Sequence, residues 1–132
     1  MEATTTGAAW EELIHAYQAH NNAFFRGDPE LHAWMHDDEV TLHGGFNVSV
    51  KGWDAVRTGL SWAASRLSDG EMTFTPLGGQ IVGDLAYLVG REEGTVRVDG
   101  GERRPMALRV TMILRYVDGQ WLCMHRHGEM IR

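Results

Sequence analysis

The stretch that decides the fold runs from Glu71 to His127 and reads EMTFTPLGGQIVGDLAYLVGREEGTVRVDGGERRPMALRVTMILRYVDGQWLCMHRH. Apolar and polar residues alternate along it with a period near two, which is typical of β-strands. Two-residue turns at Gly83-Asp84 and Asp118-Gly119, and a longer loop at Asp99-Gly100-Gly101, divide it. It therefore predicts an antiparallel meander of four strands, at about residues 71–81, 85–98, 103–117 and 120–127.

Glycines inside these strands predict that the sheet is not flat. Gly78-Gly79, Gly90 and Gly94 lie within predicted strands, where glycine marks a bulge or a bend. Strands of this length must also twist and coil to pack against helices. We therefore expect a strongly curved sheet.

Upstream of this stretch, the apolar residues follow a period near 3.6. An apolar stripe that includes Tyr17 and Phe24 predicts a helix over about residues 8–26. A second, short helix is predicted directly afterwards, because Asp28 suits the N-cap and Pro29 suits the first helical position.

A third helix is predicted at about residues 53–67, closed by the turn residues Ser68-Asp69-Gly70. Residues 40–42 read as a short strand that leads into Gly44-Gly45. Together these elements predict an α+β, cone-shaped fold in which three N-terminal helices pack on the concave face of the antiparallel sheet.

Composition places the chain among ordinary globular proteins. It has 132 residues, 43% of them hydrophobic, and shows no repeat or linker, so we expect one domain over residues 1–132 with residues 1–7 flexible. The net charge of −6 makes nucleic acid and anionic membrane surfaces poor partners.

Cysteine usage and hydropathy suggest a cytoplasmic protein. Cys123 is the single cysteine, which excludes an intrachain disulfide and suits a reducing compartment. No apolar run is long enough for a membrane span, and the first residues lack the pattern of a signal peptide. Neither a phosphate-binding glycine loop nor a serine nucleophile elbow occurs, so we expect no cofactor.

The order of these elements resembles the NTF2-like superfamily, over about residues 8–131. The most specific part is the ending: Arg109-Val110-Thr111, then Asp118-Gly119-Gln120-Trp121, then His125-Arg126-His127. It resembles SnoaL-like and ketosteroid isomerase-like small proteins, and also the association domain of calmodulin-dependent kinases. The superfamily includes isomerases, dehydratases and cyclases as well as non-catalytic binding modules, so the fold does not fix the function.

The resemblance implies catalytic roles for His43, His20 and Tyr17. Counted from Asp37-Asp38, His43 stands where ketosteroid isomerases carry their general-base aspartate, and an imidazole can accept a proton near neutral pH. Counted from Gly27-Asp28, His20 takes the place of their oxyanion-binding tyrosine. Tyr17, one turn earlier, offers a second hydroxyl donor. Each histidine can equally be a satisfied structural or solvated residue.

One position departs from the ketosteroid isomerase pattern. Met112 aligns with the aspartic acid that donates a hydrogen bond to the enolate oxygen, and methionine has no hydrogen to donate. Losing such a donor costs about a hundredfold or more in rate. Steroid isomerisation by that mechanism is therefore not expected.

Ligand contacts are expected from residues that the alignment turns into the cone. An arginine there needs an anionic ligand group or an internal carboxylate, because an unpaired buried charge is costly. The candidate ligand-binding residues are Arg126, Arg109, Met112, Met124, Trp53 and Phe24.

His125 and His127 alternate with Glu129 on the last strand, and two histidines with a carboxylate can face a metal such as iron. We expect no metal, because no second half of a metal motif accompanies them. The alignment instead places Trp121, Cys123, His125 and His127 on the outer side, where these folds commonly dimerise.

Our leading hypothesis is a cofactor-independent enzyme that isomerises, dehydrates or cyclises a small apolar or carbonyl-containing molecule in the cone. His43 would remove a proton, His20 or Tyr17 would donate to the oxygen, and Arg126 would hold an anionic end. We also expect a homodimer packed through the outer sheet face. The alternative is a non-catalytic ligand-binding or oligomerisation module.

Overall fold

A computed structural model describes residues 2–131. The chain forms two α-helices, one 3-10 turn and six strands within that range. In chain order these are α1 (Glu2–Phe25), η1 (Leu31–Ala33), β1 (Thr41–Gly44), β2 (Val48–Lys51), α2 (Trp53–Ser65), β3 (Leu67–Val82), β4 (Leu85–Val98), β5 (Arg104–Val117) and β6 (Gln120–Met130).

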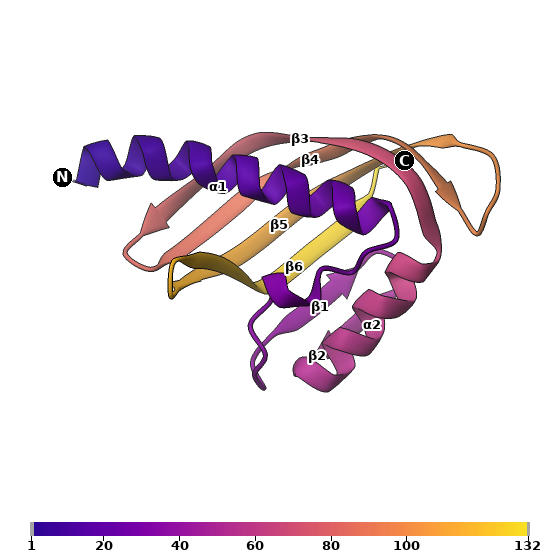
Figure 1. The fold of residues 1–132 in the computed structure, drawn as a ribbon, viewed down its shortest axis with the longest axis horizontal. Helices are drawn as coiled ribbons and strands as arrows, with labels where there is room; N and C mark the ends of the chain where they lie inside the picture. The colour runs from indigo at the N-terminus through magenta and orange to yellow at the C-terminus, as the bar shows by residue number, and fades with distance from the viewer. Residues whose placement is uncertain (1, 132) are drawn as a thin grey trace.

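The six strands form one sheet in the order β2-β1-β6-β5-β4-β3. Neighbouring strands are antiparallel except β1 and β6, which run parallel. Helix α1 lies across one face of the long strands, and α2 lies at the end of the sheet near β1 and β2 (Figure 1). This confirms the α+β architecture with a sheet that is mostly antiparallel.

The core lies between α1 and the inner face of the sheet. Alternation along β5 turns Met106, Leu108, Val110, Met112 and Leu114 inward, and each of these side chains is buried. The residues between them face outward and are more exposed. The period of two therefore defines an inner face that can hold a site and an outer face in contact with solvent.

The four predicted long strands are confirmed, with ends that differ by a few residues, and so are their turns. Register shifts interrupt β3 between Ser68 and Glu71 and between Pro76 and Gly78, which confirms the bulge predicted at Gly78-Gly79. At Gly94 a β-carbon would lie 1.9 Å from the carbonyl oxygen of Glu71, so only glycine allows the two strands to approach this closely.

The prediction of three helices is wrong, because the second helix is only the single 3-10 turn η1. Glu30 precedes this turn with a left-handed backbone, φ 51°, and donates its N–H to the Asp28 carboxylate at 2.9 Å. The chain then pairs with β6: Trp34 forms an isolated bridge with Cys123. Backbone groups that pair with β6 cannot form helical hydrogen bonds, so the helix does not extend further.

The third predicted helix ends earlier than expected. Helix α2 stops at Ser65, and Leu67 opens β3 as a buried strand residue. Ser68-Asp69-Gly70 is therefore a bulge within β3 rather than a turn that closes the helix. A β-carbon on Gly70 would lie 2.4 Å from that of Phe25, so this glycine lets α1 pack closely on β3.

Two further points concern the ends of the elements. Strand β2 was not predicted, although Val48-Ser49-Val50 alternates as a strand should. Residues 2–7 belong to the first turns of α1 and Met1 lies outside the described residues, so the flexibility expected of residues 1–7 stays a prediction. Across residues 2–131, no helix has both the length and the hydropathy that crossing a membrane requires.

Candidate functional site

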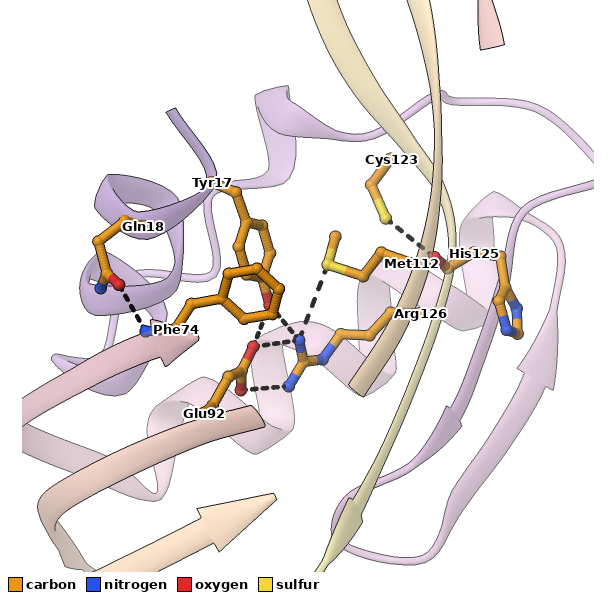
Figure 2. Close-up of polar contacts among 8 residues, drawn as sticks. All are labelled: Tyr17, Gln18, Phe74, Glu92, Met112, Cys123, His125 and Arg126. Carbon is orange, nitrogen blue, oxygen red and sulfur yellow. Dashed lines mark hydrogen bonds and ion pairs between the residues drawn. The ribbon is translucent and has the colours of Figure 1, made fainter. Parts of the chain in front are cut away.

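A buried polar cluster lies on the inner face of the sheet, under α1 (Figure 2). Glu92 of β4 is 0% exposed and lies on the same inward side of the strand as the apolar residues Ala86, Leu88 and Val96. Arg126 of β6 points at it across the sheet, and Tyr17 and Asn21 reach down from α1. We call these four residues the polar cluster.

Every oxygen of the Glu92 carboxylate is hydrogen-bonded. Arg126 donates from Nη1 to Oε2 and from Nη2 to Oε1, both at 2.9 Å. The Tyr17 hydroxyl donates to Oε2 and accepts a second hydrogen bond from Arg126 Nη1 at 2.7 Å. Asn21 completes the set when its amide nitrogen faces Glu92, 3.0 Å from Oε2. A two-pronged arginine–carboxylate pair of this kind is both strong and directional.

Burial and charge set the protonation of Arg126 and Tyr17. Burial alone would lower the pKa of Arg126, but Glu92 and then Tyr17 outweigh it and the pKa is raised, so the guanidinium stays charged. Burial raises the pKa of Tyr17 well above its ordinary value, against the opposing effect of Arg126. At neutral pH the tyrosine is therefore a phenol that can donate a hydrogen bond.

Two hollows flank the polar cluster, and they have no lining residue in common. The first, which we call the Arg126 cavity, has a volume of about 120 Å³. Its walls come from the end of α1, from α2 and from β1, β5 and β6. Apart from Arg126, Arg104 and His43 its lining is apolar: Phe24, Phe25, Leu42, Phe46, Val48, Leu60, Ala63, Leu67, Met106, Leu108 and Met130, with Gly44, Gly45 and Gly128.

The second hollow, which we call the His20 hollow, lies between α1, η1 and the β5–β6 hairpin and measures about 310 Å³. His20 Nδ1 lies 3.2 Å from Glu30 Oε1, with both side chains mostly buried. Burial lowers the pKa of His20, and Glu30 opposes this shift. Tyr17 and Met112 line the same hollow, and the rings of Tyr17 and His20 are 6.2 Å apart.

The sequence predicted that His43 lies together with His20 and Tyr17, but the structure places His43 elsewhere. Strand β1 turns Leu42 inward, so the imidazole of His43 faces outward, where its Nδ1 pairs with Ser49 Oγ at 2.8 Å. His43 borders the Arg126 cavity, but its ring is exposed. The predicted convergence of the two imidazoles on one hollow is therefore wrong.

Three predicted ligand contacts also lie elsewhere. Arg109 is exposed on the outer face, between Arg91 and Glu129 in the register. Trp53 stacks on His36 with ring centres 3.9 Å apart and lines neither hollow. Met124 also lines neither hollow. Of the remaining candidates, Phe24 and Arg126 line the Arg126 cavity and Met112 lines the His20 hollow.

A bulge at Met124 explains the error on β6. Leu114 pairs with Cys123 and Ile113 with His125, which leaves Met124 as an extra residue. The bulge reverses the alternation, so Trp121 and Cys123 line the inner His20 hollow, whereas the sequence predicted them outside. His125 lies on the opposite side of β6 from Arg126 (Figure 2), as predicted.

Sequence reasoning missed Glu92, the centre of the cluster. The sequence did contain a signal for it. Glu92 lies on the same face of β4 as Ala86, Leu88 and Val96, which are all apolar. A carboxylate on the apolar side of a strand requires a buried partner. Glu92 is thus the internal carboxylate that an inward-facing arginine had been predicted to need.

Over the described part of the chain, no group of three or more histidine, cysteine, aspartate or glutamate side chains could hold a metal ion. Cys123 is buried, and burial raises the pKa of its thiol to about 12, so it offers no thiolate. The polar cluster therefore relies on hydrogen bonds and charge.

A mostly antiparallel sheet covered by helices around an inner cavity defines the NTF2-like fold class. The model of the SnoaL-like domain matches residues 13–131. The chain therefore belongs to the SnoaL-like family. A search of curated proteins finds no match.

Solved structures agree on the fold. A ketosteroid isomerase-like protein from Erwinia carotovora atroseptica is 20% identical, with TM-score 0.72 over 100% of this chain and 98% of that one. A Streptomyces avermitilis protein, provisionally assigned as a dehydratase of the NTF2-like family, is 16% identical, with TM-score 0.73 over 100% and 99%.

A Thiobacillus denitrificans protein is 18% identical, with TM-score 0.67 over 86% of this chain and 90% of that one. It is provisionally assigned as the association domain of a calcium/calmodulin-dependent protein kinase type II. At these identities the likeness establishes the fold and leaves the activity open.

Proposed function

We propose that the Arg126 cavity binds a small, mostly apolar molecule through a carbonyl oxygen that accepts hydrogen bonds from Arg126. The observation that carries this proposal is the unused edge of the guanidinium. Arginine has five N–H donors, and Tyr17 and Glu92 engage three of them. Among the described residues, neither Nε nor the second hydrogen of Nη2 has an oxygen or nitrogen partner.

Gly128 supports this assignment, because it lies against that same edge. A β-carbon on Gly128 would be 3.1 Å from Arg126 Nη2 and 3.7 Å from Nε, and both residues line the cavity. Glycine therefore keeps two donors open to an otherwise largely apolar space. A few placed polar groups in an apolar pocket are what small-molecule sites require.

Cavity size sets the scale of the buried part of the ligand. A cavity of roughly 150 Å³ lined by apolar side chains holds one benzene ring, and this one, at about 120 Å³, is slightly smaller. It therefore holds the carbonyl group and part of a ring, while the rest of the ligand lies at the mouth beside the exposed His43 and Met130. We therefore choose acetophenone as the probe, with ethylbenzene as a match that replaces the carbonyl by a methylene. A hydrogen bond to a charged donor contributes about 1.5–3 kcal/mol, so acetophenone is expected to bind about ten- to a hundredfold more tightly.

The test uses Gly128→Ala, which narrows access to the guanidinium edge without removing the Glu92–Arg126 pair. Ligand-observed NMR titrations should show that this variant loses the preference for acetophenone. Gly59→Ala is the control: its β-carbon would meet only apolar atoms of Val48 and Leu42 at similar distances, and the preference should survive. Equal binding of the two probes to the unaltered protein contradicts the proposal.

A second candidate function is cofactor-independent acid–base chemistry in the His20 hollow, favoured by the His20–Glu30 pair. A carboxylate that holds Nδ1 leaves Nε2 free to take a proton. Tyr17 lines the same hollow, but its one hydroxyl hydrogen is donated to Glu92, so His20 is the acid–base group of this candidate. This is the isomerase, dehydratase or cyclase chemistry that the family resemblance implied, with His43 removed from it.

Exchange of α-hydrogens of acetophenone for deuterium, followed by NMR in D2O, tests this second candidate. His20→Gln should abolish any protein-dependent exchange, whereas His15→Gln, on an exposed position of the same helix, should leave it unchanged. Exchange no faster than in buffer, or equal exchange in both variants, rules out His20 as the base.

We also propose that two copies associate through the outer sheet face. Leu85 and Tyr87 of β4 support this, because these large side chains are 38% and 45% exposed there. Light scattering should give twice the mass of 14.8 kDa, and Tyr87→Lys should shift it to the monomer. A monomeric mass for the unaltered protein contradicts the proposal.

A further inference from the structure

Three histidines, His43, His125 and His127, gather on the outer face where the parallel strands β1 and β6 lie side by side, and of these only His43 also borders the Arg126 cavity. His43 is opposite His127 in the register, and Thr41 is opposite His125. The imidazoles of His43 and His127 are 4.8 Å apart between ring centres and tilted by 45°. His43 is exposed and His127 is half-buried, so both are open to a solute.

The separation of these two rings suits a shared metal ion. Imidazole nitrogens bind zinc at about 2.0–2.1 Å, which puts the ring centres of two ligands on one ion about 5 Å apart. His43 is also oriented for this role. Its Nδ1 lies 2.8 Å from Ser49 Oγ, and in the tautomer in which Nδ1–H donates to the hydroxyl oxygen, Nε2 carries no hydrogen and can bind a metal.

We propose that His43 and His127 form a two-histidine chelate for a late first-row divalent cation, namely copper, nickel or zinc, with water in the remaining positions. Imidazole suits these ions, whereas magnesium and calcium prefer oxygen ligands.

The neighbouring groups define the limits of this site. His125 is engaged elsewhere, because its Nδ1 lies 2.7 Å from Thr41 Oγ1, and we do not count it as a ligand. Glu129 follows His127 by two residues and shares its face, but Arg109 lies opposite Glu129 in the register, so this carboxylate leaves no net negative charge beside the site. At Gly44, a β-carbon would collide with the carbonyl of Gly128 and would lie 3.2 Å from the His127 ring, so glycine allows β1 to approach β6 closely beside this imidazole.

Copper titration followed by electron paramagnetic resonance tests the chelate directly. At pH 7.5, one equivalent of Cu²⁺ should give a spectrum with two coordinated nitrogens. His43→Ala and His127→Ala should each weaken binding by about tenfold or more, since one imidazole no longer chelates. Ser49→Ala should weaken it less, because it removes only the bond that orients His43.

Two further variants test whether other histidines of the chain bind the metal. His125→Ala and His15→Ala should each keep the two-nitrogen signal and the affinity. A second readout is the unfolding midpoint in Ni²⁺, which should rise with metal concentration because the folded state alone presents the pair, and should stay constant in His43→Ala. If losing His43 and His127 changes neither readout, or if losing His125 abolishes them, the proposal is wrong.

Discussion

Replacing Glu92 with Gln tests whether Glu92 and Arg126, the charged pair of the polar cluster, stabilise the fold only when both are present. The variant keeps the shape of the side chain but leaves the guanidinium of Arg126, with a side chain only 16% exposed, without a countercharge. Removing one partner of a buried pair costs about 3–5 kcal/mol. For a domain of this size each kcal/mol corresponds to about 3–5 °C, so the unfolding midpoint should fall by roughly 10–20 °C.

The decisive comparison repeats Glu92→Gln in an Arg126→Met background. There the carboxylate is the uncompensated charge, so removing it should stabilise the protein, and the sign of the Glu92→Gln effect should reverse. Urea unfolding of the four proteins in this double-mutant cycle should give a coupling of at least about 3–5 kcal/mol, because the coupling is the loss in the unaltered protein plus the gain in the Arg126→Met background.

A matched exposed pair provides the control. Arg91 and Glu93 are in contact at 3.0 Å with side chains 52% and 50% exposed, and surface pairs of this kind contribute about 0–1 kcal/mol. Their cycle should show little coupling. If Glu92→Gln costs the same with and without Arg126, the cluster is not held together by its charges and our reading of the site is refuted.

Three other predictions concern the rest of the molecule. Gly94→Ala should lower the free energy of unfolding by about 1–3 kcal/mol, because its β-carbon would collide with the carbonyl of Glu71. Gly78→Ala, whose β-carbon would have nothing within 4 Å, should change the free energy of unfolding little, and equal losses in the two variants would contradict the prediction. Cys123, whose pKa burial raises to about 12, should not react with Ellman's reagent at pH 8 until urea unfolds the chain; fast reaction in the folded state would show that the thiol is accessible. Burial, and then His127 and His43, lower the pKa of His125, so the unfolded state binds a proton at His125 at a higher pH than the folded state does, and the free energy of unfolding should fall as the pH drops below about 6.5. Between pH 7.5 and 5.5 this loss of stability should be smaller in His125→Gln, and an equal loss in both proteins would contradict the prediction.

The long strands could be predicted from the sequence because their signals are local. Turn residues such as Asp118-Gly119 and the period of two act over a few neighbours, and the structure places β4 over the predicted residues 85–98. The short helix after Asp28 could not be predicted in the same way. It depends on the pairing of Trp34 with Cys123, two residues that are far apart in the chain.

The site was harder to predict because it depends on which face each residue takes. Sequence reasoning identified Arg126 and its need for a carboxylate, and parity in β4 would have pointed to Glu92. On β6, however, one extra residue at Met124 reverses the parity, and no turn residue or glycine marks that bulge. His43 was placed by counting from a related pattern, which fixes a position along β1 but not the direction of its side chain.

The polar cluster also constrains which ligand the Arg126 cavity can favour. Glu92 already neutralises the guanidinium through two hydrogen bonds, so a second carboxylate would bring an uncompensated negative charge into a buried site. A neutral carbonyl uses the free N–H donors without that cost, so acetophenone should bind more tightly than benzoate of the same size.

The position of the cluster separates the two candidate functions. Arg126 lines one hollow, and Tyr17 and His20 line the other, so a ligand held on the guanidinium edge is not in the hollow where His20 would act. Gly128→Ala should therefore impair carbonyl binding in the Arg126 cavity and leave proton exchange at His20 intact, while His20→Gln should do the reverse. If both variants impair both properties, the two hollows form one continuous site when a ligand is bound, and the cluster must open to let the ligand span it.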